Sequence, residues 1–260
     1  MPWLVRLSLF VHVAALLVVL IHPAGWPWAL AALLANHALL STTGLLPRCN
    51  WLGANWTRLP AAAAARGEVA LTIDDGPDPL VTPAVLDLLD HHGAKATFFC
   101  VGQQAARFPE LCRDMVRRGH TIENHRQHHR HNFSLLGPGG FYRELEAAQA
   151  TLTGLSGTRP LFFRAPAGLR NPFLDVVLHR LDLRLASWTR RAYDTRMGDP
   201  ATVLRRLTAG LQAGDILLLH DRHAALTPGG IPVILEVLPQ LLDAIRHAGL
   251  RPVTLREALS

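Results

Sequence analysis

The chain has 260 residues, of which 49% are hydrophobic and 18% charged, so it is long enough to bury one large core. Its net charge is +6 and its pI is about 10.2, but Lys95 is the only lysine and no basic run is interleaved with aromatic residues. This composition argues against nucleic-acid binding and favours attraction to anionic membrane lipids. The three cysteines show no C-x-x-C spacing, so they indicate neither a disulfide framework nor a thiolate metal site. No feature predicts a protein partner.

Two apolar stretches open the chain, at residues 7–21 and 26–46, with the short segment 22–25 between them. Each is about as long as a segment that spans the hydrocarbon layer. Tryptophans stand at the edges of these stretches, as interfacial anchors do: Trp3, Trp26, Trp28 and Trp51. Because no small-x-small cleavage site precedes the second stretch, residues 1–47 are predicted to form a transmembrane helical hairpin rather than a secretory signal.

Arginines flank this hairpin but are absent from its turn: Arg6 precedes the first stretch, and Arg48, Arg58 and Arg66 follow the second. Basic residues stay preferentially in the cytoplasm, so the pattern favours a cytoplasmic location for both ends of the hairpin and the remaining chain. The expected location is therefore a bacterial inner membrane, crossed more than once. The alternative is that one stretch does not insert and the remaining chain faces the periplasm.

Residues 48–67, which contain the alanine run 61–65, are interpreted as a linker. From residue 68 onward, strand and helix patterns alternate. Strands are expected at 69–73, 96–101, 121–123, 161–163, 183–188, 216–219 and 252–255. Helices are expected at 82–93, 112–118, 142–155, 172–181, 201–213 and 231–248. Such alternation predicts an α/β domain over residues 68–260 that closes into an incomplete or distorted (β/α)7 barrel.

The first expected strand ends in two adjacent acids, Asp74 and Asp75, within the segment L-T-I-D-D-G-P at residues 71–77. Two carboxylates this close are not both buried comfortably. A hydrolase has a use for the pair, because one acid can hold a metal while the other takes a proton from water. A solvated Asp-Asp-Gly-Pro turn is the alternative.

Two histidines follow the short strand at 121–123: His125 and His129, spaced i, i+4. This spacing puts both rings on one side of a helical turn. With one carboxylate they make a three-ligand set that leaves coordination positions open, as in catalytic zinc sites. In a chain with 14 histidines, chance proximity is the alternative.

Two more strands end in ionisable groups, Arg164 in F-R-A-P-A-G and His220 in L-L-L-H-D. Taken singly, Arg164 is explained by a surface salt bridge and His220 by a strand-end contact with Asp221. Together with the first two motifs, they place polar side chains after four apolar strands. Parallel α/β folds collect their chemistry at the carboxyl ends of strands, so the sequence predicts one site there.

The four motifs T-I-D-D-G-P, N-H-x-x-x-H, F-R-A-P-A-G and L-L-L-H, in this order, resemble those of the polysaccharide deacetylase family, the NodB-homology domain. The resemblance covers residues 68–260. It implies a distorted (β/α) barrel and metal-dependent removal of an acyl group from an amide nitrogen on a sugar.

The resemblance also implies roles for individual residues. Asp75, His125 and His129 are the implied metal ligands. Asp74 is the implied general base and His220 the implied general acid.

Around this set, Arg164 is expected to keep Asp74 ionised and oriented, and the backbone N–H of Ala167 to meet the developing oxyanion. A loosely matching segment at residues 187–194 suggests that Asp194 orients His220, and that Trp188, with Pro166, walls the substrate pocket.

The chain departs from the family pattern at three positions. Arg126 replaces the usual Ser or Thr, Arg130 replaces a frequent Pro, and Ala167 replaces a frequent aromatic residue. None of these changes removes an expected ligand, but the last one leaves substrate preference open.

The ligand set suits zinc, with cobalt, nickel or manganese as alternatives. The expected function is removal of an N-acyl group, an N-acetyl group in the first instance, from a glycan or glycolipid such as a lipid-linked sugar. A lipid-linked substrate would reconcile the reaction with a cytoplasmic domain. The alternatives are a deformylase or another amidase, and a catalytically silent glycan-binding membrane protein.

Overall fold

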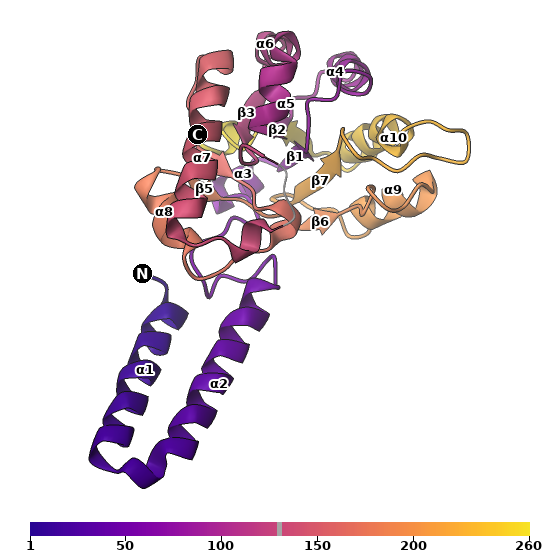
Figure 1. The fold of residues 1–260 in the computed structure, drawn as a ribbon. Helices are drawn as coiled ribbons and strands as arrows, with labels where there is room; N and C mark the ends of the chain where they lie inside the picture. The colour runs from indigo at the N-terminus through magenta and orange to yellow at the C-terminus, as the bar shows by residue number, and fades with distance from the viewer. Residues whose placement is uncertain (129–131) are drawn as a thin grey trace.

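The computed structural model describes residues 1–128 and 132–260, and it shows an α/β domain from which an N-terminal pair of helices projects (Figure 1). The projecting helices are α1 (Trp3–Ile21) and α2 (Trp26–Gly44), joined by the 3-10 turn η1 (Pro23–Gly25). The other helices are α3 (Ala61–Ala65), α4 (Thr82–His91), α5 (Gly102–Arg107), α6 (Pro109–Arg117), α7 (Pro138–Ser156), α8 (Leu174–Arg180), α9 (Pro200–Thr208) and α10 (Val233–His247). Short 3-10 turns are η2 (Phe133–Leu135), η3 (Pro166–Gly168) and η4 (Glu257–Leu259).

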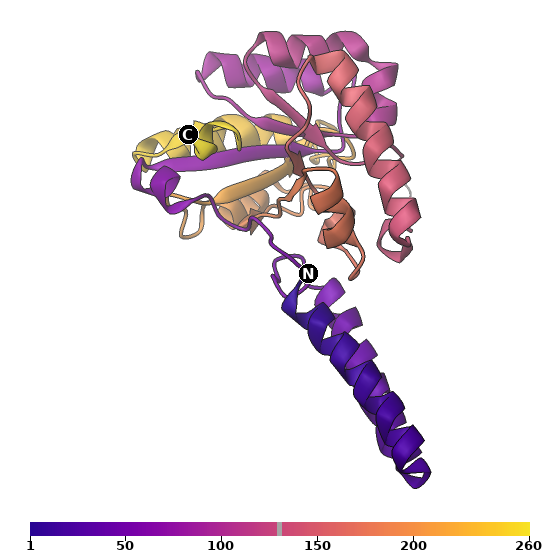
Figure 2. The same cartoon turned by 90° about the vertical axis from the view of Figure 1, so that its left-hand side faces the viewer.

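The strands form one parallel sheet in the order β5-β4-β3-β2-β1-β7-β6, with β8 beside β1. Their bounds are β1 (Glu68–Asp74), β2 (Thr97–Cys100), β3 (Thr121–Asn124), β4 (Phe162–Phe163), β5 (Arg184–Leu185), β6 (Arg190–Arg191), β7 (Ile216–His220) and β8 (Arg251–Val253). The sheet curls with helices outside it (Figure 2). β5 and β6 are the two ends of the strand order, and no pairing joins them within the described residues. The predicted incomplete (β/α) barrel is confirmed.

One expected strand differs from the prediction. Residues 183–188 were expected to be continuous, but β5 ends at Leu185 and a second strand, β6, begins at Arg190. The reason is that β5 pairs with β4 whereas β6 pairs with β7, at opposite edges of the sheet. The chain between them therefore crosses the barrel opening and brings Trp188 with it.

Side chains along β1 point alternately to the apolar core outside the barrel and to the barrel interior. Val69, Leu71 and Ile73 belong to the large apolar cluster that also contains side chains of α4 and α10. The intervening residues Thr72 and Asp74 face the other way, since successive side chains of a strand point to opposite faces of the sheet. The last residue of β1 is thus turned into the barrel.

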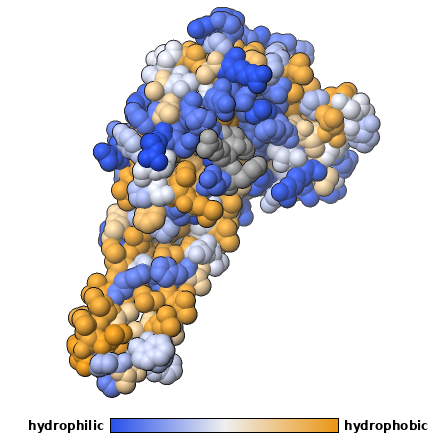
Figure 3. All heavy atoms as spheres, viewed as in Figure 1, coloured by the Kyte–Doolittle hydropathy of each residue, from blue (hydrophilic) through white to orange (hydrophobic). Residues whose placement is uncertain are grey.

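The two N-terminal helices lie side by side and contact each other, and they spread apart toward the domain (Figure 1). Asn36 Nδ2 donates to Ser8 Oγ at 2.9 Å, and the rings of His12 and His37 meet at a centroid distance of 5.2 Å. Most other side chains of the pair are apolar and exposed, which gives this part of the surface its hydrophobic character (Figure 3). The polar residues inside the apolar stretches therefore join the two helices.

Only α1, among the helices in the described residues, is long and apolar enough to cross a membrane by length and composition. A signal sequence near an N-terminus has the same properties. The second expected span, α2, is as long as α1 but carries Asn36 and His37 and is not such a helix. Of the two predicted spans, the structure supports the first.

The segment 48–67, which joins the helical pair to the barrel, packs against the barrel. Its alanine run is the helix α3, as the high helix propensity of alanine favours, and Ala63 is buried beside β1. Arg58 pairs with buried Asp215 at 2.8 Å, and the Trp56 amide donates to the Leu185 carbonyl at 2.8 Å. These contacts hold the exit of the helical pair against the domain.

Candidate active site

Strand register places Asp74 and His220 side by side. Asp74 ends β1 and His220 ends β7, and the two residues are direct partners in the parallel pairing of these strands. Both are nearly inaccessible to solvent. An acid and a histidine that lie far apart in the sequence thus share one edge of the sheet, as predicted.

Arg164, which follows β4, occupies the barrel interior between these strands and the crossing segment. Its Nη1 donates to Asp74 Oδ1 and to Thr72 Oγ1, both at 2.7 Å. The guanidinium also donates from Nε to the Ala186 carbonyl at 3.1 Å and from Nη2 to the Ser187 carbonyl at 2.7 Å. The expected contact between Arg164 and Asp74 is present, and the surface salt bridge offered as an alternative is wrong.

The buried guanidinium carries a full charge. Burial lowers the pKa of Arg164, and the neighbouring Asp74 carboxylate counteracts this effect. An arginine pKa starts above 12, so the group stays protonated at neutral pH. The ring of Phe99 lies 4.1 Å below the guanidinium carbon and adds a cation–π contact. Asp74 is therefore held in one orientation by a permanent positive charge.

The second acid of the pair, Asp75, adopts a left-handed backbone with φ of 77°, which is rare for a residue other than glycine. This turn directs its side chain away from Asp74 and toward β3. Asp75 Oδ1 lies 3.1 Å from His125 Nε2, and Oδ2 lies 3.4 Å from His223 Nδ1. The adjacent acids consequently have different partners.

The geometry of His125 fits a cation between its ring and Asp75. His125 Nδ1 donates to the Arg164 carbonyl at 2.9 Å, which fixes the hydrogen on Nδ1 and leaves the Nε2 lone pair facing a carboxylate oxygen. Two acceptors at 3.1 Å repel each other unless a metal or a proton lies between them. A backbone acceptor on the far nitrogen is the arrangement found for metal-binding histidines.

The third predicted ligand, His129, lies outside the described residues. Within the described part of the chain, no group of three His, Cys, Asp or Glu side chains is placed to hold a metal ion. The other two predicted ligands, Asp75 and His125, lie 3.1 Å apart.

Asp194 holds the ring of His220. One carboxylate oxygen accepts from His220 Nδ1 at 2.9 Å and the other accepts from the His220 amide at 2.7 Å. Burial alone would lower the pKa of His220, but the charge and hydrogen bond of Asp194, together with the charges of Asp74 and Asp75, raise it to about 9. The imidazole is thus protonated at neutral pH, with Nε2 facing away from Asp194.

The loop after Arg164 forms the turn η3, in which Ala167 is left-handed with φ of 52°. Trp188, on the crossing segment, packs closely on this loop: a methyl group on Gly168 would lie 2.8 Å from its ring and 2.4 Å from Pro47. Pro166 and Trp188, both predicted to wall the substrate pocket, therefore lie on segments that pack together.

Two residues near the site were not assigned a role from the sequence. His223 approaches Asp75, and Asp221 lies beneath the D-D-G-P turn, where any side chain on Gly76 would collide with it. Asp221 Oδ2 accepts from Thr82 Oγ1 at 2.5 Å, and burial raises the pKa of Asp221 to about 7. The cluster H-D-R-H at residues 220–223 was the available signal, because a fully buried strand ends in His220 and three more polar residues follow it.

Both the sequence and the structure of this chain are similar to those of known proteins. A family model for polysaccharide deacetylase matches residues 61–186. A peptidoglycan-N-acetylglucosamine deacetylase from Bacillus cereus is 30% identical, and the match covers 74% of this chain and 87% of that protein. The chain belongs to the polysaccharide deacetylase family.

Two further proteins support this assignment to the polysaccharide deacetylase family. A chitooligosaccharide deacetylase from Bradyrhizobium sp. is 34% identical, over 60% of this chain and 71% of that protein. The structure of a family 4 acetyl xylan esterase from Clostridium thermocellum, in complex with a cobalt ion, superposes with a TM-score of 0.65 at 32% identity. That superposition covers 74% of this chain and 89% of the other. The prediction of a hydrolase of the sugar deacetylase class is confirmed.

The buried ion pair of Arg164 and Asp74 should contribute to the stability of the fold. Arg164→Met should lower the free energy of unfolding by about 3–5 kcal/mol, because it leaves a buried carboxylate without its partner. Adding Asp74→Asn should recover part of this loss, since the isolated charge is then removed. Urea unfolding of the single and double variants measures both values. A double variant whose loss equals the sum of the single losses would show that the two side chains are not coupled.

Proposed function

We propose that this protein is a metal-dependent hydrolase that removes the N-acetyl group from N-acetylglucosamine units of a glycan, with Asp74 as general base and His220 as general acid. The observation that supports this most is the pairing of these residues on β1 and β7, each held by a buried charged partner. The Bacillus cereus and Bradyrhizobium relatives are deacetylases of peptidoglycan N-acetylglucosamine and of chitooligosaccharides. Their names support the choice of sugar and acyl group.

Asp75, His125 and His129 would hold the divalent metal. When bound, such a metal polarises the acyl carbonyl and lowers the pKa of its water. Two imidazoles and one carboxylate suit zinc, and the cobalt complex of the acetyl xylan esterase supports cobalt as an alternative. Nickel and manganese fit the same donor set.

Different residues accept and donate the protons of the reaction. Asp74, oriented by Arg164, accepts a proton from the attacking water. His220, protonated and oriented by Asp194, donates a proton to the departing amine nitrogen. The base and the acid are thereby held by separate partners, Arg164 and Asp194.

The remaining site residues position the substrate. The backbone N–H of Ala167 would meet the negative charge that develops on the acyl oxygen. Pro166 and Trp188 would form the wall of the acetyl and sugar pocket. The small side chain of Ala167 leaves room there for the acyl group.

In this proposal residues 1–47 anchor the enzyme in a bacterial inner membrane. Residues 48–67 connect this anchor to the catalytic domain, which comprises residues 68–260. The apolar helix α1 supports an anchor. The arginines that follow the helical pair favour the cytoplasmic side for the catalytic domain.

Removal of either proton-transfer group should stop the reaction. Asp74→Asn and His220→Ala should each lower kcat/KM for acetate release from N-acetylated chitooligosaccharides by about 10²–10⁴-fold, the usual contribution of a general acid or base. The exposed residues Asp182 and His247 offer matched controls, Asp182→Asn and His247→Ala, which should keep wild-type rates. Full activity in correctly folded Asp74→Asn and His220→Ala proteins would end the proposed mechanism.

Metal removal is a separate prediction. Protein treated with a chelator should lose acetate release and regain it with Zn²⁺ or Co²⁺. Asp75→Asn and His125→Ala should lower the metal content per chain, measured by mass spectrometry of the purified protein, while His247→Ala should not. Metal-free protein that still releases acetate at the full rate would refute the metal requirement.

The contact between Asp194 and His220 predicts a shift in pH dependence. The acid must be protonated, so kcat/KM should fall as pH rises through the pKa of His220, about 9. Asp194→Asn removes the charge that raises this pKa, so the alkaline fall should move to lower pH and the maximal rate should drop. The measurement is kcat/KM from pH 6 to 10 for both proteins. An alkaline limb at the same pH in both would show that another group controls it.

A further inference from the structure

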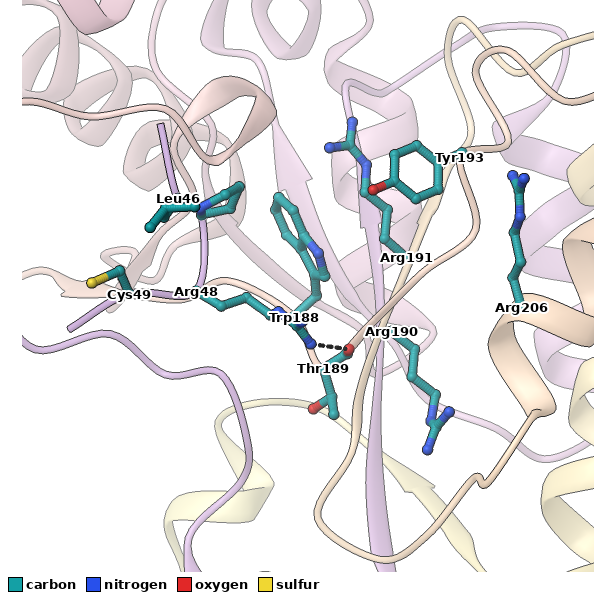
Figure 4. Close-up of a pocket in the computed structure, with 10 residues that line it drawn as sticks. Leu46, Arg48, Cys49, Trp188, Thr189, Arg190, Arg191, Tyr193 and Arg206 are labelled. Atoms are coloured by element: carbon teal, nitrogen blue, oxygen red, sulfur yellow. Dashed lines mark hydrogen bonds between the residues drawn. The ribbon is translucent and has the colours of Figure 1, made fainter. Parts of the chain in front are cut away.

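A cavity of about 660 Å³ opens where the exit of the helical pair meets the segment that crosses the barrel (Figure 4). Four arginines line it, and no acidic side chain is among its lining residues. The full lining is Leu46, Pro47, Arg48, Cys49, Trp188, Thr189, Arg190, Arg191, Tyr193 and Arg206. We call this cavity the arginine pocket.

Three of the four arginines have no ion-pair partner among the described residues. Arg190 is neutralised by Asp215 Oδ2 at 2.5 Å. Arg48 donates only to the Thr189 carbonyl at 3.1 Å, and Arg206 only to the Ala192 carbonyl at 3.4 Å. The pocket thus keeps a surplus of positive charge that a bound anion would neutralise.

Arg191 is the most constrained of the three. Its guanidinium carbon lies 5.0 Å from the centre of the Trp188 ring and 4.8 Å from the centre of the Tyr193 ring. The guanidinium carbon of Arg206 lies 5.4 Å from the centre of the same tyrosine ring. Arg191 Nε is buried and finds no hydrogen-bond partner within the described structure. A planar, preoriented guanidinium with unused donors matches the oxygens of a phosphate group.

The pocket adjoins the reaction site. Trp188 belongs to both, because it lines the pocket and packs on the η3 loop. Tyr193 directly precedes Asp194, which holds His220. The charge of Arg191 is near enough to lower the pKa of Arg164, the partner of Asp74. A group bound in the pocket and a sugar at Asp74 and His220 would be neighbouring parts of one molecule.

The pocket also lies at the foot of the helical pair. Leu46 and Pro47, which come shortly after the end of α2, form part of the wall of the pocket. Leu45 and Leu46 expose more than half of their surface. The Pro47 carbonyl accepts from Ser187 Oγ at 2.6 Å, which fixes this exit against the crossing segment. With α1 in a membrane, the arginines would lie at the level of lipid phosphates.

We propose that the arginine pocket binds the phosphate or diphosphate ester of a lipid-linked N-acetyl sugar, and so presents the sugar of a membrane-bound substrate to Asp74 and His220. This proposal rests on the deacetylase function proposed above. The same phosphate chemistry is offered by the headgroup of an anionic phospholipid, and the test distinguishes the two sources.

The test uses the full chain with its metal in nanodiscs of phosphatidylcholine. It compares kcat/KM on N-acetylglucosamine joined through a diphosphate to a polyprenyl chain with kcat/KM on a neutral N-acetylated chitooligosaccharide. The wild-type ratio should favour the diphosphate substrate by at least tenfold. Arg206→Gln and Arg191→Gln should each reduce this ratio about tenfold, mainly through KM. Arg205→Gln changes the neighbouring exposed arginine of α9, which does not line the pocket, and should leave the ratio unchanged.

Inorganic diphosphate gives a second readout without any substitution. It should compete with the lipid-diphosphate substrate in the wild type and lose this effect in Arg206→Gln. A second set of nanodiscs contains phosphatidylglycerol. If the arginine variants differ from wild type only in these discs, the pocket binds a phospholipid headgroup and the substrate proposal is overturned.

The remaining outcomes separate this proposal from the function on which it rests. Acetate release from neither substrate would overturn the deacetylase function. Acetate release from both, with a ratio near one or a ratio that the arginine variants leave intact, would overturn the phosphate site and leave the deacetylase function standing.

Discussion

The guanidinium of Arg164 is enclosed in the barrel, where it pairs with Asp74 and donates to two carbonyls of the crossing segment 186–187. A buried charge of this kind is costly unless every donor finds a partner. The same side chain therefore fixes the end of β1 and the path of the chain between β5 and β6, while its carbonyl orients His125. One arginine thus positions both Asp74 and His125.

Two neighbouring acids are compatible with this interior because the backbone turns between them. The left-handed conformation of Asp75 sends its carboxylate to His125, while Asp74 remains with Arg164. The two carboxylates then point to different partners, and the positive charge of Arg164 lies beside Asp74. The separation also gives two chemically identical side chains different surroundings, a histidine ring for Asp75 and a guanidinium for Asp74.

The helical pair is joined to the site rather than to a remote part of the domain. Its exit at Pro47 contacts Ser187 and the η3 loop, and the Arg170 amide donates to the Gly44 carbonyl at 3.1 Å. The connecting segment 48–67 is held on the barrel by the packing of α3 and by the ion pair of Arg58 with Asp215. The mouth of the site is thereby held beside the apolar helices.

The amino-acid sequence by itself determined the alternation of strands and helices, the barrel class and the set of ionisable residues at strand ends, because residue periodicity and type act locally. It also indicated the partners of Asp74 and His220 through their motifs. Only the tertiary structure decided three other features: the early end of the strand expected at 183–188, which stops at Leu185 before β6 begins at Arg190, the packing of α3, and the meeting of Arg48, Arg191 and Arg206 in one pocket. These features depend on which distant segments pair once the sheet curls, and no local pattern records that choice.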